Sequence, residues 1–163
     1  MSAPDPGTLN PRLMARQCNF IVAALIVGVL VFAGVALKIN IGGPPKENVI
    51  TWLAVAVGAT LIPISVVIPK LFVQFTLKTL THEKDPVTLV QRLSQLYLTK
   101  TILGAAAAEG GAFFNLVALI ITGHWANLVM VGCLLATMIP KFTSQVYFEG
   151  WIKSRFDELG FST

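Results

Sequence analysis

The chain has 163 residues, of which 55% are hydrophobic and 12% are charged, and its formal net charge is +4. Soluble domains usually carry about twice that charged fraction, so the composition excludes an ordinary water-soluble domain. No run of basic residues is interleaved with aromatic residues, which excludes nucleic acid as a partner. The mean hydropathy of +0.74 instead indicates a polytopic membrane protein, with the lipid bilayer as its surroundings.

Four apolar segments long enough to cross a bilayer follow one another along the chain. A helix crosses the hydrocarbon core of about 30 Å in about 20 residues. We expect spans over residues 18–37, 48–69, 101–123 and 126–142. Together they form one transmembrane domain over residues 18–142. The predicted fold is therefore all-α, with four transmembrane helices in two hairpins and amphipathic cytoplasmic helices.

The segment before the first span contains proline and aspartate, and we expect residues 1–17 to be a flexible cytoplasmic arm. The uncharged run over residues 18–37 is longer than the roughly 7–15 residues of a signal-peptide core. The first span should therefore be a retained anchor. Glycines and prolines over residues 41–45 predict a turn. In the second span, Trp52 suits the outer interface and Pro63 is expected to kink the helix.

The connection over residues 70–100 is expected to be helical. Asp85 followed by Pro86 is a strong helix start, with the aspartate as N-cap and the proline at the first position. Apolar residues then recur at helical spacing as far as Lys100, opposite a polar face. This amphipathic helix either lies on the membrane surface or continues into the third span as one long helix. The pattern leaves both arrangements open.

After the fourth span, residues 143–163 form a second amphipathic segment, which we expect to be a cytoplasmic helix. Its apolar residues, facing lipid or protein, are Phe148, Trp151, Ile152, Phe156 and Leu159. Spans two and four both end in Ile-Pro-Lys, at residues 68–70 and 139–141. This similarity suggests that the two hairpins arose by duplication, with a pseudo-symmetry axis along the membrane normal.

Lysine and arginine divide unevenly between the two sides of the predicted membrane domain. The arm, the middle connection and the tail together carry ten, whereas the opposite side carries Lys38 and Lys46. By the positive-inside rule, both termini and the middle connection are cytoplasmic. We therefore expect a multi-pass protein of the bacterial inner membrane.

Glu109 is the only acidic residue inside any of the four spans. A carboxyl group at such a depth is costly unless it is protonated, paired or facing a polar cavity. It lies about 12 Å from the inner end of its span, at a rise of about 1.5 Å per residue. Two interpretations stay open. Glu109 is either a neutral group that links neighbouring helices, or a proton or cation site with Thr60 and Asn115 as partners.

Small residues surround this depth. The predicted packing layer consists of Gly28, Gly104, Ala108, Gly111 and Gly132. Because small residues let helices approach closely, we expect a helix–helix contact along one stripe of the third span. That stripe comprises Gly104, Ala108, Gly111, Ala112, Asn115 and Ala118. The bulky side of the same helix, formed by Leu103, Phe114, Val117 and Ile121, should meet lipid or a second subunit.

The sequence GAAAAEGGAFFNLVALII at residues 104–121 resembles the carboxylate-bearing helix of rotary ATPase c subunits. That resemblance would make Glu109 an ion carrier. It covers one helix only, the glycine-rich partner helix of that family is absent, and the carboxylate lies in the first helix of its hairpin. The function is therefore not carried over. Residues 99–115 also resemble small four-helix bacterial inner-membrane proteins without a known activity, which implies a fold and a location.

The chain contains no constellation typical of an enzyme. There is no Ser/His pair, no pair of intramembrane carboxylates, no histidine cluster and no phosphate-binding glycine loop. His124 has no second ligand nearby in sequence, so no metal and no cofactor are expected. We therefore expect a structural or assembly subunit, either a homo-oligomer or an accessory part of a larger membrane complex. The alternative is a proton- or cation-handling subunit acting through Glu109.

Overall fold

The computed structural model describes residues 11–40, 49–80 and 85–159. Within these ranges the chain forms five α-helices and one short 3-10 helix. They are α1 (Pro11–Asn40), α2 (Val49–Leu80), α3 (Pro86–Thr122), α4 (Trp125–Met138), η1 (Ile139–Lys141) and α5 (Gln145–Glu158). The prediction of an all-α fold is confirmed. The turn expected over residues 41–45 lies outside the described residues.

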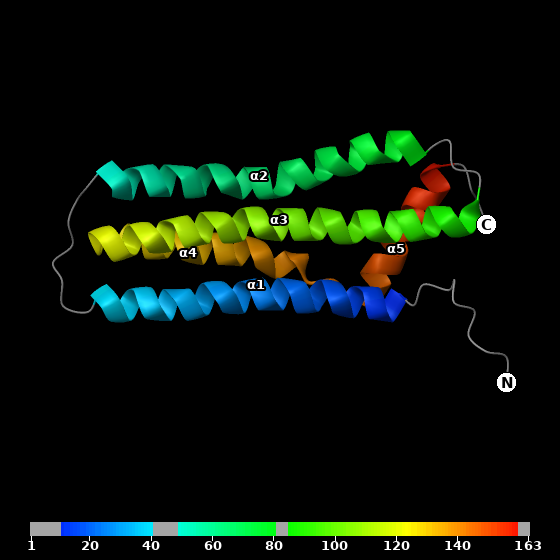
Figure 1. Cartoon of the computed structure of the whole chain (residues 1–163). Helices are drawn as coiled ribbons and strands as arrows, with labels where there is room; N and C mark the ends of the chain where they lie inside the picture. Colours follow the sequence, from blue (N-terminus) through cyan, green and yellow to red (C-terminus); the bar gives the residue numbers. More distant parts are fainter. Residues whose placement is uncertain (1–10, 41–48, 81–84, 160–163) are drawn as a thin grey trace.

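The long helix α3 lies at the centre of the bundle (Figure 1). α1 and α2 flank it on opposite sides, and α4 packs against it from behind. α5 crosses the end where α1 begins. The core therefore forms on α3, from residues that are small or aliphatic: Ala105, Ala108, Ala112, Leu116 and Leu119, with Val22 and Val29 of α1 and Val131, Leu134 and Met138 of α4.

Three helical segments are long and apolar enough to cross a bilayer: Leu13–Ile39, Val49–Leu80 and Thr88–Thr122. The segments Trp125–Lys141 and Gln145–Glu158 qualify only as a pair, which is bent by 71°. Large apolar side chains cover the outside of the bundle, as Phe20 at 75% exposure and Val31 at 64% illustrate. Soluble monomeric proteins rarely expose so much contiguous apolar surface. The chain is a multi-pass membrane protein with three or four candidate spans.

The start of α3 agrees with its sequence. The backbone N–H of Thr88 donates to Asp85 Oδ2 at 3.1 Å, and the N–H of Leu89 donates to the Asp85 carbonyl at 3.0 Å. The helix then runs without a break to Thr122. Of the two arrangements that the sequence left open, one long helix is therefore correct. Gly123, at a φ of 64°, ends it, because this left-handed conformation suits glycine.

Helix α1 begins at Pro11, seven residues before the expected span, so part of the predicted arm is helical. Proline suits the first position of a helix because its missing N–H has no partner there anyway. Tertiary packing explains the rest of the extension. Ala15 and Cys18 are both buried, and Cys18 packs against Tyr97 of α3 and Phe148 of α5.

Helix α2 continues through Pro63 and Pro69 to Leu80. A proline leaves the carbonyl four residues earlier without its usual amide donor. For Pro69 that carbonyl belongs to Ser65, and Lys141 Nζ donates to it at 3.1 Å. Gly104 of α3 lies against the same point, because a Cβ there would stand only 2.7 Å from the Ser65 oxygen. We call these four residues the lysine junction. It joins α2, α3 and η1 at one level of the bundle.

The two Ile-Pro-Lys segments adopt different conformations. Pro69 lies inside a continuous helix, whereas Pro140 lies in η1, which ends at Lys141. Beyond η1 the chain turns, and Asn19 of α1 holds the turn. Its Nδ2 donates to the Thr143 carbonyl at 2.9 Å, and the Thr143 N–H donates to its Oδ1 at 2.7 Å. The Tyr97 hydroxyl bonds the Thr143 hydroxyl at 2.7 Å.

The amphipathic tail forms α5, with Ser144 as its N-cap. Phe148, Trp151 and Ile152 pack with Cys18 of α1 and Tyr97 of α3. Further along, Phe156 and Leu159 join Val73 and Leu80 of α2 and Leu89 and Leu93 of α3 in a second cluster. The apolar face of the tail therefore meets protein. α5 closes what we call the basic end of the bundle, the end where α1 starts and α2 stops (Figure 1).

Candidate functional site

The two sides of α3 differ as the sequence pattern predicts. Every member of the small stripe is buried: Gly104, Ala108, Gly111, Ala112, Asn115 and Ala118. Every member of the bulky side is exposed: Leu103, Phe114, Val117 and Ile121. Glu109 lies between the two sides and is half-buried. The carboxylate is thus at the edge of the bundle rather than at its centre.

Glu109 approaches α1 at a glycine. Its Oε1 lies 3.9 Å from the position that a Cβ on Gly28 would take. One turn further along α3, Phe113 packs edge-on against Phe32 of α1, with ring centroids 5.3 Å apart. The contact between α1 and α3 therefore brings the carboxylate beside the backbone of α1, within van der Waals distance of a Cβ at Gly28.

The Glu109 carboxylate has no hydrogen-bond donor and no cation close by among the described residues. It lies five residues from Gly104, or about 7.5 Å along the helix, on the membrane side of the lysine junction. A polar group in hydrocarbon without a partner costs several kcal/mol, of the order of 2–7. A proton, water or a group from another molecule must therefore satisfy this side chain.

Thr60 and Asn115 lie away from Glu109. Thr60 is exposed on α2, and its hydroxyl donates to the Ala56 carbonyl at 2.6 Å. Asn115 is fully buried, and its Nδ2 donates to the Ala54 carbonyl at 3.0 Å and the Gly111 carbonyl at 2.9 Å. Asn115 thus bonds α2, whereas Glu109 faces α1. The structure does not bring the three predicted site residues together.

The predicted packing layer divides in the same way. Gly104 belongs to the lysine junction, and a Cβ on Gly111 would stand 2.9 Å from Leu61 of α2. Ala108 is also buried. Gly28 is half-buried beside Glu109, while Gly132 of α4 is exposed with no atom within 4 Å of a Cβ position. Among the glycines of the predicted layer, the close contacts are therefore those of α3, and a further one lies outside the layer at Gly58 of α2, where a Cβ would stand 2.5 Å from Met130.

A group of polar residues that sequence analysis did not single out lies in the other half of the bundle. Thr51, Thr122 and Asn127 are buried on α2, α3 and α4. Asn127 Nδ2 donates to Thr122 Oγ1 at 3.2 Å, and Thr122 bonds its own helix. Single polar residues near span ends look like interface residues in a sequence, so only their burial identifies them. The Asn127–Thr122 bond joins α4 to α3 in the apolar interior, whereas the buried Thr51 hydroxyl has no hydrogen-bond partner among the described residues.

His124 has a structural role in the connection between α3 and α4. Its Nδ1 accepts from the backbone N–H of Ala126 at 3.2 Å, which caps α4. Its ring lies 6.0 Å from that of Trp125 and 6.2 Å from that of Trp52. Both tryptophans are exposed, as is typical of an interfacial aromatic belt. No group of three metal-ligating side chains occurs among the described residues.

No family model, no curated protein and no solved structure matches the chain. The two resemblances noted above therefore rest on the residues quoted for them.

Proposed function

We propose that this chain is an integral membrane assembly subunit that forms a homo-oligomer, with Glu109 at the contact between copies. One observation carries the proposal. A half-buried carboxylate within a predicted span has no partner among the described residues. A partner from a second molecule would supply the missing hydrogen bond.

The surface next to Glu109 suits close contact with another helix. Leu103, Ala106, Gly110, Phe114 and Val117 form an exposed stripe along α3. We call this stripe the open face. Its five residues are exposed, so the other described helices do not cover it. Ala106 and Gly110 are small, and Gly110 has no atom within 4 Å of a Cβ position. Small residues beside a polar group are the usual features of helix–helix contacts in membranes.

A second copy of the chain is the partner that best fits the depth of Glu109. Rotation about an axis along the membrane normal keeps every residue at its depth, so each copy presents its Glu109 at the same level. A protonated carboxyl group both donates and accepts a hydrogen bond. Two such groups can therefore satisfy each other, or each can bond the backbone of the other copy.

The proposed topology has four spans, with both termini in the cytoplasm of the bacterial inner membrane. α4 has 14 residues and η1 has 3. End to end they are about 25 Å long, which is close to the thickness of the hydrocarbon core, about 30 Å. The bend before α5 supports this assignment, because it turns the chain across the basic end. The excess of lysine and arginine at that end supports its assignment to the cytoplasmic side.

Labelling of an introduced cysteine tests this topology. Ser154 of α5 and Lys38 of α1 are both exposed, at opposite ends of the bundle. In a Cys133→Ser background, Ser154→Cys should react with a membrane-impermeant maleimide in inverted vesicles but not in spheroplasts. Lys38→Cys should show the opposite result. Reaction of Ser154→Cys in spheroplasts would contradict the four-span topology.

Substitution of Glu109 tests the assembly. Glu109→Leu removes the hydrogen bond and should weaken association by roughly 3- to 30-fold, since interhelical hydrogen bonds in membranes contribute about 0.6–2 kcal/mol. Glu109→Gln keeps a donor and an acceptor and should stay near the wild type. The measurement is the oligomer fraction in liposomes against protein density, by single-molecule photobleaching.

The matched control for this experiment is Cys133→Leu, an exposed site on α4, behind the central helix. It should leave association unchanged. In addition, Gly110→Cys in a Cys133→Ser background should cross-link two copies with a short bismaleimide. A monomer at every protein density, or equal behaviour of Glu109→Leu and Cys133→Leu, would overturn the proposal.

The alternative, a proton- or cation-handling subunit, is supported by the same carboxylate. Its position at the edge of the bundle leaves it reachable, as a group that exchanges ions has to be. The two functions differ in one variant. Glu109→Gln should abolish pH- or sodium-dependent flux in vesicles if Glu109 carries ions. Under the assembly proposal the same variant keeps its oligomeric state, and no flux is lost.

A further inference from the structure

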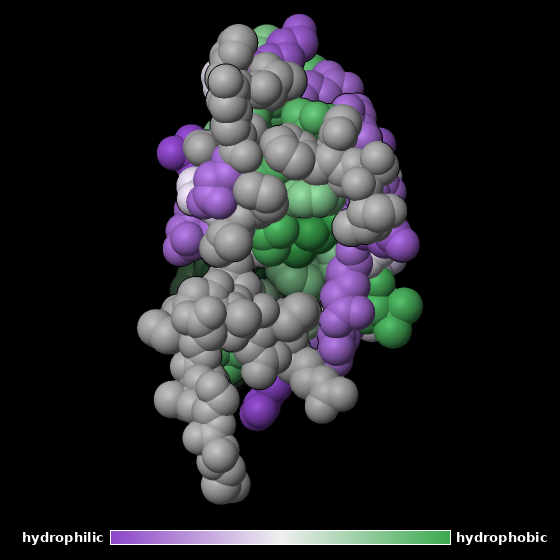
Figure 2. Space-filling model, turned by 90° about the vertical axis from the view of Figure 1, so that its right-hand side faces the viewer, coloured by the Kyte–Doolittle hydropathy of each residue, from purple (hydrophilic) through white to green (hydrophobic). Residues whose placement is uncertain are grey.

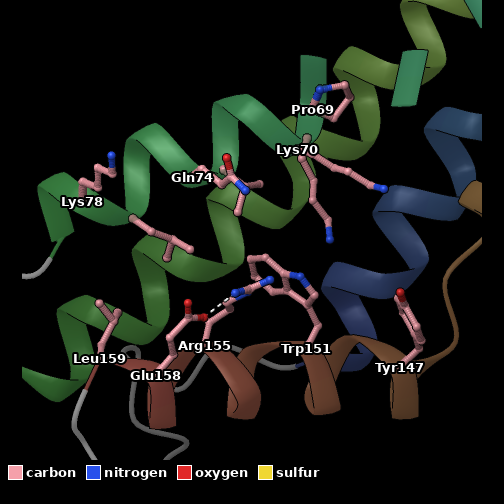
Figure 3. A pocket seen from close by; sticks show the side chains of 12 residues that line it. Pro69, Lys70, Gln74, Lys78, Tyr147, Trp151, Arg155, Glu158 and Leu159 are labelled. Atoms are coloured by element: carbon pink, nitrogen blue, oxygen red, sulfur yellow. Dashed lines mark hydrogen bonds and ion pairs between the residues drawn. The ribbon is translucent and has the colours of Figure 1, made fainter. Parts of the chain in front are cut away.

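A second site lies away from Glu109, at the basic end of the bundle. An open cavity of about 690 Å³ separates α2 from α5. Pro69, Lys70 and Gln74 line it from α2, and Trp151 and Arg155 line it from α5 (Figure 3). The indole of Trp151 stands in the middle, pointing from α5 toward α2 (Figure 3). The cavity volume is within the range of about 300–1,000 Å³ that is usual for small-molecule sites.

Positive charge gathers in this cavity. Lys100 of α3 places its Nζ 4.1 Å from the centroid of the Trp151 ring and 4.2 Å from that of Tyr97. The guanidinium carbon of Arg155 lies 5.9 Å from the Trp151 ring. Such cation–π contacts stabilise a charge, but they supply no counter-ion. Half-buried Lys100 is thus held at the cavity by aromatic faces.

Negative charge in the cavity is scarce. Among the described residues that line it, Glu158 has the one carboxylate, against the basic side chains of Lys70, Lys100 and Arg155, with Lys78 left aside because it has an interaction of its own. Glu158 is already engaged in an ion pair with Arg155 (Figure 3). The Nε of Arg155 is buried and has no acceptor among the described residues. The cavity therefore has more basic than acidic side chains and a buried donor, Arg155 Nε, without an acceptor among the described residues. Both features favour the binding of an anion.

The depth of the cavity identifies the kind of anion. Pro69 belongs to the lysine junction and is the last residue of the second span expected from sequence, residues 48–69. Lys70 and Gln74 lie about 1.5 and 7.5 Å further along α2. The headgroup layer of one leaflet is about 5–8 Å thick, so both side chains start within it. On the other side of Pro69, Val66 and Val67 are 46% and 49% exposed, which provides an apolar surface for acyl chains.

Figure 2, which views the molecule from this end, shows hydrophilic side chains along both sides of a hydrophobic strip.

We propose that the cavity between α2 and α5 binds the phosphate of an anionic phospholipid headgroup. The basic side chains attract the phosphate as point charges, and the acyl chains continue along α2 into the hydrocarbon. Basic pockets between membrane helices at the cytoplasmic face suit such headgroups. This site does not depend on Glu109 or on assembly.

The test uses the full chain purified in a neutral detergent, titrated with phosphatidylglycerol. The thermal unfolding midpoint, followed against lipid concentration, gives the affinity. Phosphatidylglycerol should raise the midpoint by several degrees, because a ligand that binds only the folded state stabilises it. Phosphatidylcholine and soluble glycerol 3-phosphate at the same concentrations should not. Raising the salt concentration should weaken the effect.

Two variants with the same change in charge locate the site. Gln74→Glu places a carboxylate in the cavity and should weaken phosphatidylglycerol binding at least tenfold. Gln95→Glu on α3 is exposed and outside the cavity, and should stay within twofold of the wild type. If Gln74→Glu fails to fold, Lys70→Gln is used in its place, because Lys70 is exposed. It should weaken phosphatidylglycerol binding by the same factor.

Three results would overturn the proposal. Equal stabilisation by phosphatidylcholine would show that the headgroup charge is not recognised. Equal stabilisation by glycerol 3-phosphate would assign the cavity to a soluble phosphate instead of a lipid. Equal losses in Gln74→Glu and Gln95→Glu would show that the net charge of this end attracts the lipid without a defined site.

Discussion

Gly104→Ala is expected to lower the free energy of unfolding by about 2–6 kcal/mol. A Cβ at this position would stand 2.7 Å from the Ser65 carbonyl oxygen and 2.6 Å from Lys141 Nζ. The lysine side chain can move aside, but the carbonyl belongs to the backbone of α2 and cannot. Overpacking costs about 1–3 kcal/mol. A Ser65 carbonyl left without its Lys141 donor adds a similar amount, about 1–3 kcal/mol.

Gly110→Ala is the matched control for this prediction. It makes the same substitution on the same helix, but at a site with no atom within 4 Å of the new Cβ. Alanine is the better helix former by up to about 1 kcal/mol, so this variant should be as stable as the wild type or slightly more so. The measurement is reversible unfolding in mixed micelles. Equal stability of the two variants would show that α2, α3 and η1 do not meet as described.

Asn19→Leu is expected to release α5 from the bundle while α1, α2, α3 and α4 stay folded. Asn19 bonds both backbone groups of Thr143, at 2.9 and 2.7 Å. Leucine can replace neither bond, and each buried group left unpaired costs about 1–3 kcal/mol. Hydrogen exchange in α5 should rise at least tenfold. Trypsin should cut at Lys153 and Arg155 earlier than in the wild type.

Gln17→Leu provides the comparison, because Gln17 is exposed two residues earlier on the same helix. It should leave exchange and proteolysis in α5 unchanged. Because α5 forms one wall of the cavity, Asn19→Leu should also weaken phosphatidylglycerol binding, whereas Gln17→Leu should not. Unchanged exchange in α5 of Asn19→Leu would mean that Phe148 and Trp151 hold the helix without the turn.

The sequence predicted well those features that depend on neighbouring residues. Asp85 and Pro86 start α3 because an N-cap and a first-turn proline act within four residues. The helical wheel separated the buried small stripe of α3 from its exposed bulky side because side chains on a helix recur every 3.6 residues. These predictions needed no knowledge of what the helix packs against.

The sequence did not predict the ends of the helices or the surroundings of the candidate site. α2 continues past Pro69 because Lys141, 76 residues away, supplies the donor for the Ser65 carbonyl. α1 begins early because α3 and α5 cover Cys18. Thr60 and Asn115 were grouped with Glu109 by depth alone. Depth fixes the level of a residue in the membrane, but it leaves open the direction in which the side chain points.

By itself the sequence determined that this chain is a helical, multi-pass membrane protein with a single acidic residue inside its predicted spans, because hydropathy and helix starts are local properties. Only the tertiary structure decided that Glu109 faces α1 at Gly28, that Asn115 bonds α2, and that α5 turns back to enclose a basic cavity. Contacts such as Asn19–Thr143 and Asn115–Ala54 join residues 124 and 61 positions apart. They depend on how each helix is rotated against its neighbours, and that rotation is set by the packing of all the helices together.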